Sequence, residues 1–194
     1  MTKSNQKIPE GWSVKKLGNC ILSFSGGTPS ANTSDYYEKG TIPFIRSGEI
    51  SQDFTELFIT EKGLKESSAK MVEKGDLLLA LYGANSGETS ICKIHGAINQ
   101  AILCIRMKND NLKYLENIFI FYKNKILQKY LQGGQGNLSA EIVKSLCFKF
   151  PPLPEQEKIA EILGTWDTAI EKLSALIEQK KRRKKGLMQR LLSG

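Results

Sequence analysis

The C-terminal part of the chain carries an apolar repeat that strongly limits how it can fold. Between Glu155 and Leu192 there is no proline, and only Gly164 and Gly186 weaken the helix propensity, each by roughly 1 kcal/mol relative to alanine. Large apolar side chains alternate there at spacings of four and three residues. We call them the heptad seam: Ile159, Leu163, Trp166, Ile170, Leu173 and Ile177. Because a sustained seven-residue repeat is typical of coiled coils, the seam predicts a long helix that dimerises by pairing with another helix.

The alternative is an ordinary amphipathic helix that packs on its own domain. A helix from Glu155 to Leu192 is about 57 Å long at 1.5 Å per residue, which is longer than the preceding domain is expected to be wide. A helix that packs along its own domain does not need so regular a seven-residue repeat. The sequence therefore favours a helix pair, either parallel or antiparallel.

Six consecutive cations, Lys180–Lys185, follow the seam and surround the helix on all sides. A run of like charges is often a solvated stretch whose members repel one another. It can also contact phosphates or an acidic surface of a partner protein. The sequence leaves both interpretations open.

Residues 1–150 have a different character, with short apolar runs between Gly, Pro, Ser and Asp. Four of these runs predict strands: TIPFIRSGEI, GDLLLALYG, AILCIRM and SLCFKF. The stretch NLKYLENIFIFYKNKILQKYLQ has helical spacing, and the prolines of FPPLPEQ then end the last strand. We therefore expect an α+β fold, with a mixed α/β domain over 1–150 followed by one long C-terminal coiled-coil helix over 151–194.

Composition and charge narrow the class of protein. The chain has a net charge of +8 and a pI near 9.3, which favours an anionic partner, nucleic acid foremost. No apolar run reaches the roughly 18 residues that a membrane-spanning helix needs, and the N-terminus lacks a secretory apolar segment. The four cysteines are scattered, as free thiols in a reducing compartment are. We expect a cytoplasmic protein without a membrane partner.

Residue patterns for catalysis or cofactor binding are not found in the sequence. His95 is the single histidine, and no cysteine pair accompanies it to form a zinc site. The glycine-bearing segments match neither the P-loop nor the dinucleotide fingerprint, and no nucleophile elbow occurs. The sequence predicts a chain with no catalytic residue, metal or cofactor of its own.

Polar side chains gather instead in glycine-bearing loops and at the end of one expected strand. Asn and Gln pair with adenine and Arg pairs with guanine in the major groove, although Gly, Asn and Ser also form ordinary turns. Several such loops on a basic domain predict base reading in double-stranded DNA. The candidate DNA-binding residues are Thr28, Ser30, Arg46, Ser47, Tyr82, Asn85, Gln135 and Asn137.

An ordered series of motifs resembles the specificity subunit of type I restriction-modification systems. The series runs over nearly the whole chain: IPEGWSVKKLGNC, SGGTPS, IPFIRSGEI, KGDLLLALYGANSG, GAINQAI, GGQGNLSAEIVKSL and PPLPEQEKIAEIL. The resemblance implies a target recognition domain over about 1–150 and a conserved helical region that spaces and assembles the complex. It also implies a non-catalytic role beside a methyltransferase subunit, which binds S-adenosylmethionine and methylates adenine N6. A motor and nuclease subunit for restriction can join them.

The chain departs from the family pattern in one respect. Members usually carry two recognition domains and two helical regions, whereas this sequence has one of each. Either it is a half-sized subunit that forms a homodimer through its heptad seam, or it is a piece of a longer chain. A two-fold, antiparallel dimer would read an inverted bipartite site. The alternative function is a coiled-coil module whose globular head recognises protein.

Overall fold

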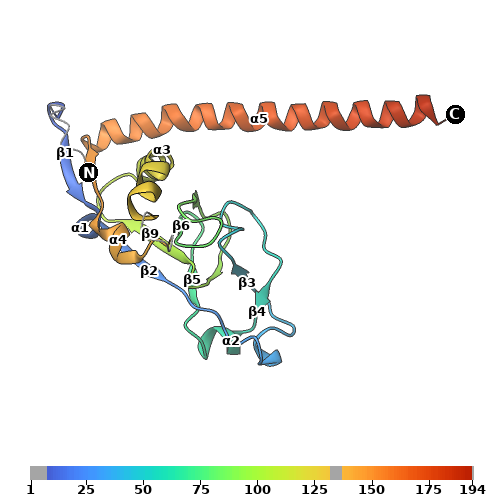
Figure 1. Ribbon diagram of the computed structural model, residues 1–194, viewed down its shortest axis with the longest axis horizontal. Helices are drawn as coiled ribbons and strands as arrows, with labels where there is room; N and C mark the ends of the chain where they lie inside the picture. The colour runs from blue at the N-terminus through green and yellow to red at the C-terminus, as the bar shows by residue number, and fades with distance from the viewer. Residues whose placement is uncertain (1–7, 132–136, 194) are drawn as a thin grey trace. The chain divides into compact units, whose positions relative to one another are not determined.

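The computed structural model describes residues 8–131 and 137–193. The chain divides into two compact units, Met1–Gln156 and Glu157–Gly194. In Figure 1 the first unit consists of strands and mostly short helices, and the chain ends in one continuous helix. The expected α+β fold is confirmed, with mixed sheets followed by a long C-terminal helix.

The described part of the first unit contains two four-stranded sheets and a two-stranded ribbon. The first sheet is antiparallel throughout, in the order β2 (Ile21–Ser25), β9 (Ile102–Met107), β6 (Leu77–Ala80) and β7 (Thr89–Ile91). The second sheet has the order β4 (Phe58–Ile59), β3 (Ile42–Ile45), β8 (Gly96–Ile98) and β5 (Lys70–Val72). Only β3 and β8 pair in parallel there. The ribbon pairs β1 (Ser13–Lys16) with β10 (Cys147–Phe150).

Short helices connect these strands, and one longer helix covers the ribbon. The short ones are α1 (Leu17–Cys20), η1 (Ser34–Tyr36), α2 (Glu61–Lys65) and α4 (Ala140–Ser145). The longer helix, α3 (Leu112–Leu131), confirms the helix predicted from its apolar spacing. Its Tyr114 and Phe119 make edge-to-face contacts with Phe150 and Phe148 of β10. These aromatic contacts fix α3 against the ribbon.

A shared apolar core joins the two sheets. Leu78 and Ala80 of β6 cluster with Ile45 of β3 and Ile98 of β8. Leu78 and Ala80 point into this core from the same face of β6, because side chains two residues apart in a strand share a face. The two sheets also approach each other closely at Gly26, where an added Cβ atom would lie 1.8 Å from the carbonyl oxygen of Ile98. Only glycine allows the chain after β2 to run this near to β8.

The long helix α5 spans Leu153–Leu192 and confirms the predicted C-terminal helix, which begins two residues earlier than Glu155. Its first turn belongs to the first unit. There the buried amide of Gln156 accepts a hydrogen bond from the backbone N–H of Asn111 at 2.9 Å and donates to Asp110 at 2.7 Å. Among the described helices, none has the length and apolarity to cross a bilayer.

Candidate nucleic-acid interface

The strand register brings most of the predicted loops to one edge of the first unit. Ala80 pairs with Ile102, and Ser25 pairs with Leu103, so β2 and β6 end where β9 begins. In the second sheet β3 and β8 run in parallel with Ile45 beside Ile98, so residues 46 and 99 also emerge there. We call this surface the loop edge: residues 26–30, 46–47, 81–88, 99–101 and 137.

Arg46 is exposed at the loop edge, but its guanidinium is held by two carboxylates. Nε and Nη2 donate to the Glu49 carboxylate at 3.1 and 2.7 Å, and Nη2 also donates to Glu56 at 2.7 Å. Glu49 further accepts from the backbone N–H groups of Arg46 and Glu56 and from the hydroxyl of Thr55. This arrangement orients the arginine, and the described residues leave its Nη1 group facing no partner.

Glu49 is the centre of this network. Burial opposes its ionisation, but the hydrogen bonds from Arg46, Glu56 and Thr55 outweigh burial and lower the pKa of Glu49 to about 2. The side chain of Glu49 is only 8% exposed, whereas that of Glu56 is 75% exposed. The buried carboxylate, not the exposed one, therefore holds the 46–56 loop in place.

Replacing Glu49 with glutamine is expected to lower the free energy of unfolding by about 2–3 kcal/mol at neutral pH, because an amide N–H then faces the Arg46 donors. The folded-state pKa is depressed, so the stabilisation is full above the ordinary value of 4.5 and is lost as the pH falls towards 2. Urea unfolding between pH 7 and pH 2 measures this difference. Glu56→Gln, which removes the exposed partner of the same arginine, should cost less than about 1 kcal/mol. Equal losses for the two variants would contradict the role given to Glu49.

The 81–88 loop, which carries Tyr82 and Asn85, is folded by its own hydrogen bonds. The buried Ser86 hydroxyl donates to the carbonyl of Leu81 at 3.0 Å, and Gly83 and Gly87 adopt positive φ. Asn85 and Tyr82 are both half-buried. A Cβ atom on Gly48 would lie 3.4 Å from the Asn85 amide nitrogen, so this loop adjoins the loop that follows Arg46 and Ser47.

Three of the remaining predicted DNA-binding residues lie in other loops of the loop edge. Asn137 is exposed, and the N–H of the next residue, Leu138, donates to the carbonyl of Leu81 at 2.7 Å. Thr28 and Ser30 are exposed in the loop after β2. Gln135 lies outside the described residues.

Gln100 is a loop-edge residue to which sequence reasoning gave no role. It is exposed in the turn between β8 and β9, and its amide oxygen accepts a hydrogen bond from the Thr28 hydroxyl at 2.6 Å. Its position in the GAINQAI motif was the available signal. The motif alone does not predict the strand pairing that brings Gln100 close to Thr28 and to the 81–88 loop.

The single histidine, His95, lies beside one acidic side chain. His95 is exposed, and its Nδ1 lies 2.7 Å from a carboxylate oxygen of Glu73, which is also exposed. Within residues 8–131 and 137–193, no group of three His, Cys, Asp or Glu side chains is placed to hold a metal ion.

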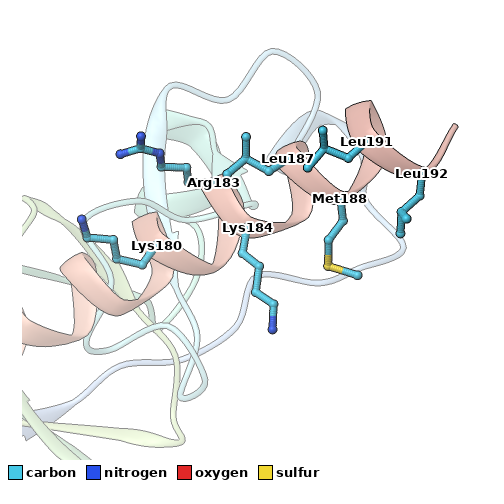
Figure 2. Close-up of a pocket in the computed structure, with 7 residues that line it drawn as sticks. All are labelled: Lys180, Arg183, Lys184, Leu187, Met188, Leu191 and Leu192. Atoms are coloured by element: carbon cyan, nitrogen blue, oxygen red, sulfur yellow. The ribbon is translucent and has the colours of Figure 1, made fainter. Parts of the chain in front are cut away.

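The helix α5 carries a second candidate surface. Trp166, Ile170 and Leu173 of the heptad seam are 66%, 60% and 59% exposed, while Ile159 is half-buried. So much exposed apolar surface in a regular stripe is typical of an interface. Towards its end the helix bears cations followed by apolar side chains, which line a shallow hollow in Figure 2: Lys180, Arg183, Lys184, Leu187, Met188, Leu191 and Leu192.

The family model described as "Type I restriction modification DNA specificity domain" matches residues 9–180. The specificity subunits of the type I restriction enzymes MjaVIII and MjaIX from Methanocaldococcus jannaschii are similar relatives. The MjaVIII subunit is 28% identical over 96% of this chain and 43% of its own length. The MjaIX subunit is 31% identical over 85% of this chain and 40% of its own length.

Solved structures show the same fold. A chain from a study of complex assembly and conformational transition of the type I R-M system aligns with a TM-score of 0.74 at 19% identity, over 99% of this chain and 47% of that one. The HsdS subunit from Thermoanaerobacter tengcongensis aligns with a TM-score of 0.66 at 18% identity, over 88% of this chain and 41% of that one. This chain therefore spans less than half the length of each of these proteins. Since the family model covers most of the sequence, including both the loop edge and the heptad seam, the chain belongs to the type I restriction modification DNA specificity domain family.

Proposed function

We propose that this chain recognises a DNA sequence for a type I restriction-modification complex and performs no chemistry itself. One observation carries the proposal. Exposed or half-buried Thr, Arg, Tyr and Asn side chains from separate loops lie together at the loop edge. These side chains are the kinds that bind base edges and phosphates, and several carry fixed orientations.

The division of labour that we propose is the one that the family resemblance implies. Residues 1–150 serve as the target recognition domain, and 151–194 form the region for spacing and dimerisation. The methyl transfer to adenine N6 belongs to a methyltransferase subunit that binds S-adenosylmethionine. A restriction subunit is a further partner of the complex.

We further propose that two copies pair through the heptad seam. Full burial of a large apolar side chain contributes about 1.5–3 kcal/mol, and the seam supplies six such side chains per helix to offset the ordering cost of association. A two-fold dimer presents two identical loop edges, so it would read the same half-site twice in inverted orientation.

The charge along α5 supports an antiparallel pair. Acidic side chains are concentrated in its first part, at Glu155, Glu157, Glu161, Asp167 and Glu171. The cations are concentrated after it, in Lys180–Lys185 and at Arg190. An antiparallel pair over the seam brings Glu155 and Glu157 of one helix towards the start of the cation run in the other, whereas a parallel pair places like charges together. Cations beyond the overlap remain available for phosphates or for an acidic partner surface.

Mapping N6-methyladenine across the genome of the source cell tests the proposed function. We expect a bipartite, inverted methylated motif in cells that carry this gene and its loss when the gene is deleted. Restoring the gene on a plasmid should restore the motif. An unchanged methylation map after deletion would contradict the proposal. It would favour the protein-interaction module, which should also retain no duplex at about 150 mM salt.

A further inference from the structure

We infer that Gln100 is a specificity-determining residue of the loop edge and that its carboxamide recognises an adenine base. The inference rests on the proposed function, because it assigns one base contact within that DNA interface. It stands on three features of the structure: a fixed backbone around Gln100, an oriented side-chain amide, and hydrogen-bonding groups that stay free.

The backbone on both sides of Gln100 is fixed. The N–H of Ala101 donates to the side-chain oxygen of Asn99 at 3.1 Å, which closes a tight turn. The carbonyl of Ala101 accepts from the N–H of Leu81 at 2.8 Å, and Ile98 before the turn is fully buried in β8. Gln100 is therefore an exposed side chain on a rigid turn between two core strands.

The amide of Gln100 is also oriented. The hydroxyl of Thr28 donates to Gln100 Oε1 at 2.6 Å. Thr28 follows two glycines that lie directly against neighbouring backbone, since a Cβ on Gly26 would lie 1.8 Å from the carbonyl oxygen of Ile98 and one on Gly27 would lie 2.9 Å from the carbonyl carbon of Ser68. A free glutamine loses considerable rotamer freedom when it binds, so an amide held in advance binds with a smaller entropic cost.

The free groups of the amide match adenine. Oε1 keeps one lone pair after accepting from Thr28, and within the described residues the Nε2 group has no hydrogen-bond partner. An acceptor beside a donor complements the N6 amino group and N7 of adenine. Guanine presents two acceptors at the same edge, which would leave Oε1 facing a lone pair. The uncharged amide is also a weak choice for a phosphate contact compared with the cations of this chain.

Base preference is the measurement that tests this inference. The full chain, with the methyltransferase subunit of its system, is incubated with a library of duplexes of random sequence, and the bound fraction is sequenced. Gln100→Ala should lose roughly 10- to 100-fold of its preference for adenine at one position of the half-site and keep its other preferences. Gln100→Glu presents only acceptors, so the preference at that position should move from adenine towards cytosine.

A matched pair at Thr28 tests the orientation of the amide. Thr28→Val keeps the shape of the side chain but removes the donor, and it should weaken the preference for adenine at that same position several-fold. Thr28→Ser keeps the hydroxyl and should retain the parent preference. All four variants change exposed side chains, so their urea unfolding midpoints should match that of the parent.

Three results would overturn the inference. Unchanged base preferences in both Gln100 variants, with a selective parent protein, would remove Gln100 from base reading and leave the proposed function intact. Equal weakening on all sequences would make Gln100 a phosphate contact. A parent protein that binds all duplexes alike would overturn the proposed function together with the inference.

Discussion

Replacing both Leu173 and Ile177 with glutamate is expected to convert the dimer that we propose into a monomer. These side chains are 59% and 46% exposed on the helix, and pairing through the seam would bury them. The exchange removes four apolar contacts from a two-fold interface and places four carboxylates in it. Association should weaken by at least about 4 kcal/mol, roughly a thousandfold. Light scattering with size-exclusion chromatography measures the solution mass directly.

The control for this variant uses the opposite face of the same helix. Thr168→Glu with Ala175→Glu adds the same charge at exposed positions halfway between seam residues, and it should keep the parent mass. Both double variants should retain the circular dichroism of a folded chain. A Leu173→Glu, Ile177→Glu protein with the same mass as its parent would refute pairing through the seam.

Gly26→Ala is expected to destabilise the first unit by at least about 3 kcal/mol. The added methyl group would lie 1.8 Å from the carbonyl oxygen of Ile98, and that carbonyl belongs to a buried strand paired on both sides. Neither backbone can move away without disturbing the core between the sheets. The loss is a large fraction of the 5–15 kcal/mol typical of a folded domain, so urea unfolding should show a much lower midpoint.

Gly48→Ala is the matched control for this substitution. Gly48 is also a glycine of the loops near the loop edge, but its nearest heavy atom within 4 Å is the Asn85 amide nitrogen at 3.4 Å, an ordinary van der Waals distance. Its unfolding free energy should change by less than about 0.5 kcal/mol. Comparable midpoints for the two alanine variants would show that the two sheets can separate at Gly26 without cost.

The regular elements of this protein were predictable where the pattern was long. The seven-residue repeat gave α5, the helical spacing gave α3, and the apolar runs gave β3, β6, β9 and β10. Strands β5, β7 and β8 have only three residues each, too few for an alternation to stand out. Their assignment depends on partners that lie far away in the sequence.

The candidate site was predictable by residue type but not by arrangement. The sequence indicated Thr28, Arg46 and Asn85 because they are polar residues in or near glycine-bearing loops. That these loops lie at one edge depends on the strand pairing, which the sequence did not predict. The two carboxylates on Arg46 went unrecognised because Glu49 and Glu56 look like ordinary loop residues in the sequence. Gln100 went unrecognised because its orientation depends on Thr28, which is distant along the chain.

The separation between core strands and loop edge has an evolutionary consequence. The polar side chains at that edge sit outside the paired strands, so codon changes there leave the framework intact. If these side chains read DNA as proposed, substitutions among them would change the recognised sequence while the scaffold stays the same. Gly26 is the opposite case, because any side chain added there would collide with the backbone of a core strand.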